Sequence, residues 1–416
     1  MSRVITYGTF DLLHYGHKRL LERAKQLGDY LIVGVTSDDF DRRRGKINTH
    51  QSLMERIAAI RALGIADEII VEEYVGQKID DIKRYDIDIF TVGSDWEGKF
   101  DYLKEYCEVV YLPRTEGISS SDIRAEKADI KIGIIEGSGV ERKFEKECEF
   151  VNGVKVSDPE GADAVYIVGM PENHYADIRH ALLEGRHVIC ESPIATTRHQ
   201  CEELQNLAKD KKLVLMDGIK PAYATAYSRL LLLIKSGAIG EVVSVDTTCT
   251  SIEDKRYAEG ELEGKWNSIC AWGPTALLPV FQILGTKYTD RHIFNTFVDD
   301  EKKYDAFTKI DFVYPNAVAS IKVAKAAKSE GSMVITGTEG YIYVPAPWWK
   351  TDYFEIRYEN AENNKRYFYQ LDGEGIRYEI VAFIKSIETG KDYSYISEDV
   401  SKEIVSTIEA CLHEGR

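Results

Sequence analysis

The stretch YGTFDLLHYGHKRLLERAK, residues 7–25, follows a single short β-branched run and places His14 and His17 around Gly16 in the pattern His-Tyr-Gly-His. Behind the second histidine, apolar residues recur at helical spacing. The pattern predicts a strand that ends at Gly8, then a turn, and then a helix whose amino-terminal end carries both histidines.

A helix start of this kind is suited to binding an anion, because its unpaired backbone N–H groups and its dipole both favour negative charge. Gly16 lets the backbone approach a phosphate closely. Two imidazoles there can donate hydrogen bonds to phosphate oxygens and stabilise charge at a transferring phosphorus. Two histidines that are merely solvated, or that cap the helix, would have the same sequence pattern, so the phosphate-binding interpretation depends on the surrounding segments.

Three later segments support a phosphate site. GSDWEGKF, residues 93–100, and RTEGISSSDIR, residues 114–124, each follow a predicted strand, 87–92 and 109–112. Open parallel sheets bind ligands at this carboxyl edge. The loop DRRRGK, residues 41–46, adds four basic residues. In so acidic a chain, this loop is well placed to receive a triphosphate.

The order of the predicted elements indicates three domains. Strands alternate with helices up to about residue 127, which is typical of an open parallel α/β sheet. The pattern restarts with a strand at 130–135, and after about residue 240 strands dominate, closed by two helices near 378–388 and 401–412. We therefore predict domains at 1–127, 128–240 and 241–416, the last with an antiparallel sheet.

Composition excludes several classes of protein. The chain of 416 residues has 53 Lys and Arg against 69 Asp and Glu, a net charge of −16, which argues against nucleic-acid binding. Its seven cysteines lack metal-type spacing and indicate reduced thiols and a cytoplasmic protein. The start shows no signal region, and the longest apolar run, residues 230–234, predicts no membrane insertion.

Residues 1 to about 126 resemble the glycerol-3-phosphate cytidylyltransferases of teichoic-acid synthesis, within the HxGH nucleotidyltransferase superfamily. Four segments carry this resemblance: ITYGTFDLLHYGH, LLERAKQLGDYL, DWEGKF and CEVVYLPRTEGIS. It implies a Rossmann-like domain that joins CTP and a small polyol phosphate into a CDP-polyol and pyrophosphate, for teichoic-acid or capsule synthesis. Mg²⁺ would accompany the triphosphate.

The resemblance also implies a site. Its catalytic residues would be His14, His17, Lys46 and Arg114. The nucleotide would be bound by a further set: Tyr7, Gly8, Thr9, Phe10, Asp11, Gly16, Asp95, Trp96, Thr115, Gly117, Ile118 and Ser119.

Two departures concern the acceptor side of the pocket. Near Gly64 the family usually has an arginine, and near Val75 a tryptophan. Arg61 or Arg56 could compensate. The acceptor is therefore open: glycerol 3-phosphate is the first choice, and another alditol phosphate or a related small phosphate is the alternative.

Residues 130 to 416 resemble the Gfo/Idh/MocA oxidoreductases, through ADAVYIVGMPENHYADIRHALLEGRHVICESPIATT, KSGAIGEVVSV and VITGTEGYIYV. This implies a Rossmann-like domain followed by an open antiparallel sheet that often forms an oligomer face, hence a homodimer or homotetramer. Residues at possible dinucleotide-binding positions are Gly137, Gly139, Pro171, His174 and Glu191.

The family's proton-handling positions are altered. Its acidic-lysine-proline motif reads Glu191-Ser192-Pro193 here, and its helical aspartate and histidine align with Ala271 and Thr275. Neither Ser192 nor Thr275 titrates near neutral pH, whereas hydride transfer to a carbonyl needs a proton-exchanging group. Lys220 is the best substitute, followed by His180 or His187.

The first half of this Rossmann-like domain is also short. Between Gly139 and Asp163 there is room for one helix and one strand, GVKVS, and we expect no strand to carry the acidic ribose ligand. Three interpretations follow. The second half is a non-catalytic scaffold, with NAD(P) binding doubtful; or it is an active NAD(P)-dependent reductase that makes the alditol phosphate; or both halves only bind ligands.

Overall fold

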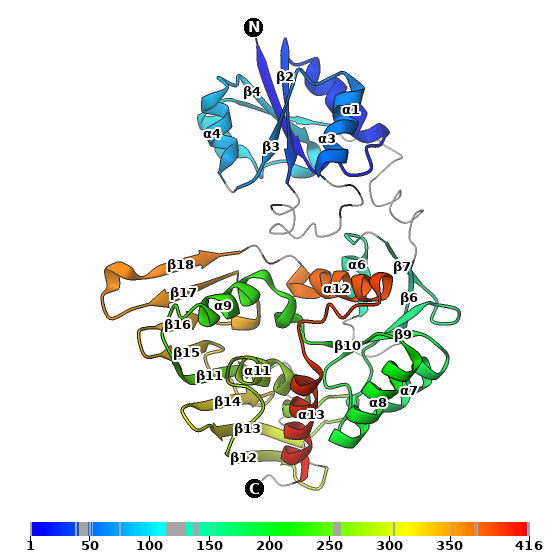
Figure 1. Cartoon of the computed structure of the whole chain (residues 1–416), viewed down its shortest axis with the longest axis vertical. Coiled ribbons are helices and arrows are strands. Elements are labelled where there is room, and N and C mark those ends of the chain that lie inside the picture. The colour runs from blue at the N-terminus through cyan, green and yellow to red at the C-terminus, as the bar shows by residue number, and fades with distance from the viewer. Residues whose placement is uncertain are drawn as a thin grey trace. The chain divides into compact units, whose positions relative to one another are not determined.

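The computed structural model describes residues 2–37, 40, 49, 51, 53–74, 76–113, 130–135, 141–151, 153–252, 259–302, 304–350, 352–369, 371 and 373–413. Two compact units make up the chain (Figure 1). Unit 1 comprises Met1–Asp129 and Glu149–Val154, and unit 2 comprises Ile130–Cys148 and Lys155–Arg416. None of the helices in the described part of the chain is long and apolar enough to cross a membrane.

Unit 1 is built on a parallel sheet of five strands in the order β3-β2-β1-β4-β5. The strands are β1 Arg3–Gly8, β2 Tyr30–Thr36, β3 Glu68–Glu72, β4 Ile89–Gly93 and β5 Glu108–Leu112. Strand order reverses beside β1, which pairs with both β2 and β4. Parallel sheets bind ligands at the carboxyl edge of such a switch point, and this edge is where the His-Tyr-Gly-His turn begins.

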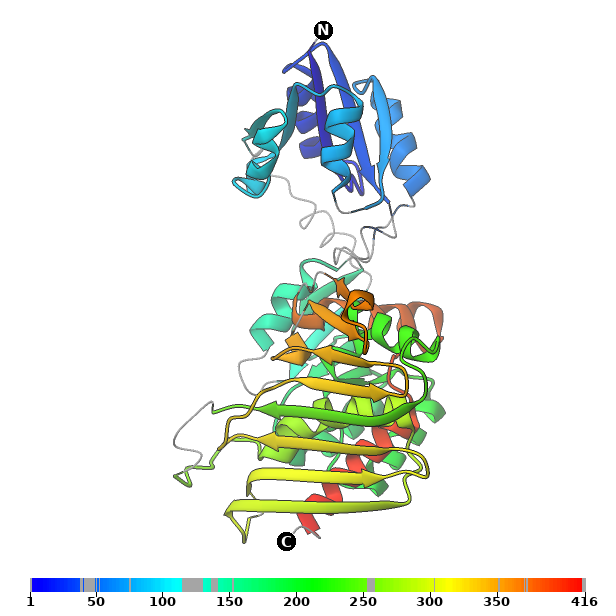
Figure 2. The ribbon, with the colours of Figure 1, turned by 90° about the vertical axis from the view of Figure 1, so that its left-hand side faces the viewer.

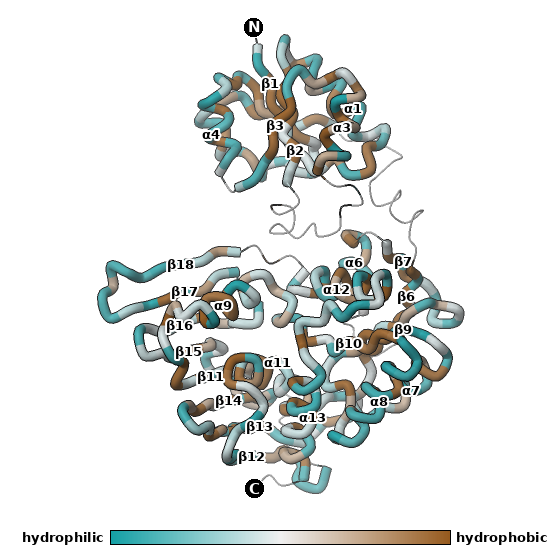
Figure 3. The backbone as a smooth tube through the Cα atoms, in the orientation of Figure 1, coloured by the Kyte–Doolittle hydropathy of each residue, from teal (hydrophilic) through white to brown (hydrophobic). Residues whose placement is uncertain are grey.

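Helices cover both faces of this sheet, as a parallel sheet requires. On one face, α1 (Tyr15–Lys25) and α3 (Leu53–Leu63) bury Leu21 and Ile60 against strand residues such as Val33. On the other, α4 (Gln77–Arg84) and the short turn η2 (Asp101–Glu105) pack on the second core. The central strands are the most apolar segments of the unit (Figure 3). These elements confirm the α/β alternation predicted from the sequence.

Unit 2 begins with a Rossmann-like sheet in the order β10-β9-β8-β6-β7. Its strands are β6 Ile130–Ile135, β7 Val154–Ser157, β8 Ala164–Ile167, β9 His187–Glu191 and β10 Leu215–Gly218. Its helices are α6 Glu141–Cys148, α7 Pro171–Leu183 and α8 Arg198–Lys211. Only α6 and β7 separate β6 from β8 in the described residues, so the first half is short, as predicted.

One expectation about this half is wrong. The sequence predicted no strand to carry the acidic ribose ligand, but the strand predicted at GVKVS is present as β7, which lies beside β6 at the edge of the sheet and ends at Ser157, directly before the exposed Asp158. Val154 of this strand is buried. A carboxylate therefore stands at the end of the second strand of the half, the place where dinucleotide folds have one.

The rest of unit 2 is an eight-stranded sheet in the order β12-β13-β14-β11-β15-β16-β17-β18. Its strands are β11 Val242–Thr250, β12 Asp290–Asp299, β13 Tyr304–Val313, β14 Val318–Ala324, β15 Met333–Gly337, β16 Tyr341–Val344, β17 Tyr353–Arg357 and β18 Lys365–Phe368. All neighbouring strands are antiparallel except β11 and β14. This confirms the predicted change to a mainly antiparallel sheet.

Helices lie behind one face of this sheet when the other is viewed (Figure 2). They are α9 (Thr225–Lys235), the mostly apolar α11 (Ser268–Leu284), and α13 (Glu398–His413), with α12 (Ile376–Thr389) nearby. Helix α13 contacts both α11 and α8, and α12 contacts α6. Val405 of α13 joins the core formed by α7 and α8. The last two helices therefore pack the Rossmann-like part and the large sheet into one unit.

Candidate functional site

The two motif histidines meet at the start of α1. His14 is the N-cap of the helix, and its Nδ1 accepts a hydrogen bond from the His17 backbone N–H at 3.4 Å. The two imidazoles stack with their centroids 3.8 Å apart. Both side chains are half-buried. This places two ring edges beside the helix N-terminus, where backbone and side-chain donors can act on one anion.

The turn before the histidines has an unusual backbone. Phe10 and Leu12 have φ of 53° and 48°, in the left-handed region that side chains rarely adopt. Phe10 is buried and meets the edge of the His17 ring, with centroids 5.5 Å apart. Asp11 accepts a hydrogen bond from the Gln51 backbone N–H at 3.0 Å. Such strain persists where the surroundings fix it, and it is frequent at functional sites.

Arg56 of α3 fixes these surroundings. It is fully buried, and its guanidinium donates to the carbonyls of Thr9 at 2.7 Å, Thr36 at 2.9 Å and Gln51 at 3.2 Å. These carbonyls belong to the segment after β1, to the last residue of β2 and to the segment before α3. Arg56 therefore holds the carboxyl edge together, and it is not an exposed substitute for the arginine missing near Gly64. Arg61, on the same helix, is exposed.

A small pocket of about 60 Å³ lies at the same edge. It is lined by four predicted nucleotide-site residues, Tyr7, Gly8, Thr9 and Trp96, together with Thr36, Glu72, Lys78, Phe90, Val92 and Phe100. The structure therefore brings the turn after β1 and the short helix η1 (Ser94–Trp96) into one wall.

Lys78 is the basic residue among the lining residues that the sequence analysis did not predict. It is buried, pairs with the buried Glu72, and lies 4.5 Å from the Tyr7 ring centroid. Tyr7 donates to Asp81 at 2.8 Å, and burial followed by this bond raises the pKa of Tyr7. The available signal was Glu72 and Lys78 on either side of the turn after a strand, where parallel sheets place ligand-binding side chains.

Of the other residues predicted for this site, two lie in described elements and six lie outside the described residues. Gly16 lies in the first turn of α1, and Asp95 is exposed in η1. The remaining predicted residues fall outside the described part of the chain: Lys46, Arg114, Thr115, Gly117, Ile118 and Ser119.

Unit 2 has a second, larger pocket of about 490 Å³, at the carboxyl ends of β8, β9 and β10. It brings together the altered positions Ser192, Ala271 and Thr275, the last two on one face of α11. The spacing that aligned these residues with the family's proton-handling groups is therefore consistent with one site.

Lys220 reaches the same pocket. Its Nζ lies 2.9 Å from Glu191 Oε1, and Tyr166 donates its hydroxyl to the same carboxylate. Burial would lower the pKa of Lys220, but the carboxylates of Glu191 and Glu379 outweigh it, so the pKa is raised and the group is an ammonium ion. Glu379 lies fully buried beside them, and burial followed by the charge of Glu191 raises its pKa.

The predicted cofactor-side residues occupy different surroundings. His174 is fully buried, with Nδ1 2.8 Å from the Pro193 carbonyl and Nε2 2.9 Å from the Gly169 carbonyl. Its ring joins the turns after β8 and β9. Pro171 is the first residue of α7. Gly137 and Gly139 lie outside the described residues.

Known proteins match the two units separately. The family model described as "Cytidylyltransferase-like" matches residues 5–126. A glycerol-3-phosphate cytidylyltransferase from Bacillus spizizenii is 54% identical over 130 residues, which are 31% of this chain and 100% of that protein. One from Staphylococcus aureus is 49% identical over 126 residues, covering 30% of this chain and 95% of its own length.

The second unit matches a different family. The model "Oxidoreductase family, NAD-binding Rossmann fold" covers residues 124–219. Among solved structures, KijD10, a 3-ketoreductase from Actinomadura kijaniata, has a TM-score of 0.58 at 16% identity, covering 69% of this chain and 98% of that one. The UDP-N-acetylglucosamine 3-dehydrogenase GnnA from Acidithiobacillus ferrooxidans has a TM-score of 0.57 at 16% identity, covering 68% and 99%. At this identity the likeness shows the fold alone.

Both resemblances noted in the sequence are thereby confirmed. Through its first unit the chain belongs to the glycerol-3-phosphate cytidylyltransferases, a family of nucleotidyltransferases, and this unit is followed in the sequence by an oxidoreductase domain of the Gfo/Idh/MocA type.

Proposed function

We propose that unit 1 transfers CMP from CTP to a small polyol phosphate, with glycerol 3-phosphate as first choice, giving a CDP-polyol and pyrophosphate for cell-surface polymer synthesis. The observation that carries the proposal is the stacked His14–His17 pair at the N-terminus of α1, beside the switch point of the sheet. The glycerol-3-phosphate cytidylyltransferases that match this unit along their whole length supply the substrate class.

The reaction needs no protein nucleophile. A phosphate oxygen of the acceptor attacks the α-phosphorus of CTP, a new P–O bond forms there, and the bond to the bridging oxygen breaks as pyrophosphate leaves. Positioning and charge neutralisation provide the acceleration. His14 and His17 would donate to the phosphate oxygens that gain charge, Lys46 and Arg114 would neutralise the triphosphate, and Mg²⁺ would accompany it.

For the acceptor we propose the pocket that contains Lys78. It is lined by Tyr7, Thr9 and Trp96 and is separated from α1 only by the turn after β1. Its Lys78 side chain, buried and paired with Glu72, supplies an N–H donor beside the predicted nucleotide residues. Lys78, and not Arg56, would contact the acceptor, because the Arg56 guanidinium is bound to backbone carbonyls.

The experiment is pyrophosphate release by the intact chain with CTP or ATP and a panel of polyol phosphates. We expect turnover with CTP and glycerol 3-phosphate or another small alditol phosphate. Turnover with ATP and none with CTP would contradict the proposal. A Lys78→Met variant should raise KM for the acceptor more than KM for CTP, and Lys99→Met, at an exposed lysine near Trp96, is the matched control.

For unit 2 we propose a scaffold without hydride transfer, because Ser192, Ala271 and Thr275 stand where the family has proton-handling groups. A specific observation favours the alternative of an active reductase: the Lys220 ammonium enters the same pocket and pairs with Glu191. Oxidation of NADH or NADPH by the intact protein with a keto-phosphate, lost in Lys220→Ala, would establish the alternative.

A further inference from the structure

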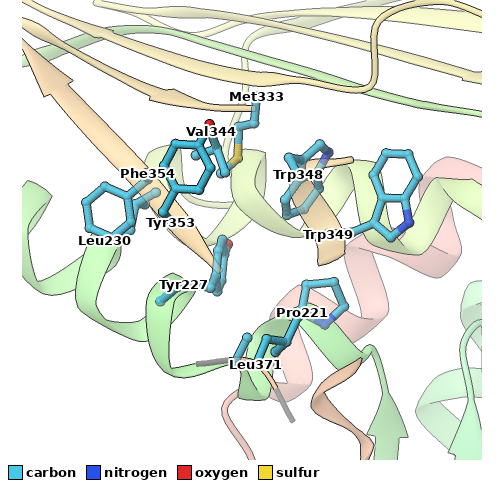
Figure 4. A pocket seen from close by; sticks show the side chains of 12 residues that line it. Pro221, Tyr227, Leu230, Met333, Val344, Trp348, Trp349, Tyr353, Phe354 and Leu371 are labelled. Carbon is cyan, nitrogen blue, oxygen red and sulfur yellow. The ribbon is translucent and has the colours of Figure 1, made fainter. Parts of the chain in front are cut away.

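A further pocket of unit 2 lies along the outer edge of β10. It has a volume of about 590 Å³, and α8, β10, the end of α12 and the start of α13 contribute to its lining. None of its described lining residues also lines the pocket of about 490 Å³. The apolar gap among Tyr227, Met333 and Phe354, which Figure 4 shows, has by contrast about 20 Å³, room for about one water molecule. The pocket beside β10 therefore has the size of a small-molecule site, about 300–1,000 Å³.

One residue of β10 presents its backbone to this pocket. In the described part of the chain, β10 is the last strand of its sheet and pairs with β9 alone. The Val188 N–H donates to the Val214 carbonyl at 2.8 Å. Further along, the Ser192 N–H donates to the Gly218 carbonyl at 3.3 Å. Because bonded residues alternate along a parallel strand, the N–H and the C=O of Leu215 both point to the open edge.

The neighbouring edge groups are already bonded. The Leu213 N–H donates to the Ala208 carbonyl at 2.9 Å, and the Asp217 carbonyl accepts from the Ile219 N–H at 3.2 Å. An added peptide strand would need a row of open groups, because it bonds to every second residue of the edge. One N–H beside one C=O, both on Leu215, instead match the edge of a planar base, which carries a donor next to an acceptor.

Apolar side chains from separate segments line the same pocket. Those near β10 and α8 are Ile194, Ala208, Leu213 and Leu215, and those around the end of α12 are Ile387 and Ile396. Leu213, Leu215 and Ile387 are only half-buried. They therefore keep apolar area that a ligand can cover, and the two faces of a base are surfaces of this kind.

His187 adds a hydrogen-bond donor. Its Nδ1 accepts from the Val214 N–H at 3.0 Å, so the proton of the neutral ring is on Nε2. Burial lowers the pKa of His187, against the charge of Asp163, and this keeps the ring neutral near pH 7. The sequence suggested His187 as a proton-handling substitute, but it lines the pocket beside β10 and not the one that contains Ser192. Its Nε2–H can donate to a base or to a ribose hydroxyl.

Lysines supply positive charge at this pocket. Lys209 pairs with Glu398 at 2.6 Å. Lys212, the C-cap of α8, and Lys391, in the loop after α12, are exposed and form no ion pair with the described residues. Asp392 also lines the pocket and accepts from a backbone N–H two residues on, at 2.7 Å. On a chain with a net charge of −16, two ammonium groups at one concave site favour an anionic group such as a phosphate.

We propose that this pocket binds a nucleotide, with the edge of its base on the Leu215 N–H and C=O, the faces of the base against the apolar side chains, and its phosphates on Lys212 and Lys391. The inference depends on unit 2 alone. It holds whether or not unit 1 transfers CMP, and whether or not the pocket of about 490 Å³ binds a dinucleotide.

Photoaffinity labelling of the intact chain provides the test. The probes are 4-thio-UTP and 8-azido-ATP, and mass spectrometry of the digested protein locates the label. NADH in excess occupies any dinucleotide site of the Rossmann-like domain. We expect saturable labelling of peptides from residues 205–215 or 386–401, suppressed by unlabelled CTP or ATP. Label in unit 1 falls on other peptides, so a failure of the proposed CMP transfer is distinguishable from a failure of this inference.

Variants test the assigned contacts. Leu215→Pro removes the N–H at the open edge and no bond to β9, and it should weaken labelling about fivefold, the scale of one hydrogen bond. Lys212→Gln and Lys391→Gln should each weaken it about threefold. Lys212→Arg should retain most of the labelling. Lys211→Gln, at the exposed neighbouring lysine outside the lining, should leave it unchanged.

Circular dichroism shows which variants are folded, and the lysine variants decide the question if Leu215→Pro does not fold. The proposal is overturned if the label maps to unit 1 only, or if excess NADH abolishes labelling of the peptides beside β10. It is equally overturned if Lys212→Gln and Lys391→Gln are labelled as strongly as Lys211→Gln.

Discussion

At the scale of the residue, the geometry of His14 and His17 determines what unit 1 can do. One ring caps the helix and lies parallel to the other, so their separation is fixed by the backbone of the first turn of α1. Phe10 closes one edge of the pair from the strained turn before it. Preorganised donors of this kind act where charge develops in the transition state, without reorganising during the reaction.

We expect His17→Ala to lower kcat by about two orders of magnitude or more, the scale of losing one preorganised donor. The fold should remain, because the ring is half-buried and the cap is on His14. Steady-state kinetics with CTP and the preferred acceptor, together with circular dichroism, provide the measurement. His180→Ala, at an exposed histidine of α7, is the control. Near-normal kcat in a folded variant would place the phosphate site elsewhere.

A second residue, Asp217, makes the stability of unit 2 depend on pH. Burial raises the pKa of this carboxyl to about 6, against the hydroxyls of Ser401 and Ser192. The folded state thus holds the proton more tightly than the unfolded state. Its contribution to stability is present below about pH 4 and is lost as the pH rises through about 6.

Across that window we expect the free energy of unfolding of unit 2 to fall by up to about 3 kcal/mol because of this group. Asp217→Asn should remove this part of the fall. Urea unfolding followed by tryptophan emission between pH 4 and pH 7 measures it, with Asp210→Asn, at an exposed position, as the control. A variant whose pH dependence equals that of the wild type would rule out Asp217 as the cause.

At the scale of the element, α3 explains how three separate segments form one edge. The Arg56 guanidinium reaches from this helix to carbonyls after β1, at the end of β2 and before α3 itself. A planar fork of donors can serve several carbonyls, whereas a lysine presents one compact group. The helix thereby fixes the strained turn that precedes α1.

Arg56→Lys should therefore destabilise unit 1 by about 3 kcal/mol and lower kcat about tenfold or more, since buried carbonyls lose charge-assisted donors. The measurement is the unfolding midpoint together with kcat for CMP transfer. Arg61→Lys on the same helix is exposed and should change neither. Full activity in a destabilised Arg56→Lys would show that Arg56 stabilises the fold without positioning the site.

The elements also show what the sequence could and could not reveal. Apolar alternation is local, so the strands predicted at 87–92 and 109–112 agree with β4 and β5 within two residues. The short strand β7 was predicted at GVKVS, whereas Asp158 was missed because it lies one residue beyond that segment. Lys78 was missed because its buried ion pair with Glu72 forms only in the folded protein. In the sequence, a charged residue on a helix such as α4 normally indicates a solvent-exposed face.

At the scale of the whole molecule, the chain carries two units with separate cores. Unit 1 alone spans the full length of the Bacillus spizizenii relative. Residues 1–129 should therefore fold alone and keep kcat/KM within about tenfold of the intact chain, as independent domains do. Kinetics of the truncated and intact proteins, side by side, provide the comparison. A folded but inactive fragment would show that unit 2 contributes to the site.

The large sheet bears on assembly. One face has helices packed behind it, and exposed apolar side chains such as Phe294, Tyr341 and Phe368 lie on its strands. We expect a homodimer or homotetramer that depends on unit 2. Light scattering should show that removing residues after 129 changes the oligomeric state more than the chemistry, whereas an unchanged oligomer would place the interface in unit 1.

The most direct test of the central claim is the fate of the acceptor's phosphate oxygens. Glycerol 3-phosphate labelled with ¹⁸O in its phosphate, incubated with CTP and the intact protein, is followed by mass spectrometry of both products. If an acceptor phosphate oxygen attacks the α-phosphorus, all the label appears in CDP-glycerol and none in pyrophosphate. Label in pyrophosphate, or no CTP-dependent product with any small polyol phosphate, would contradict the account.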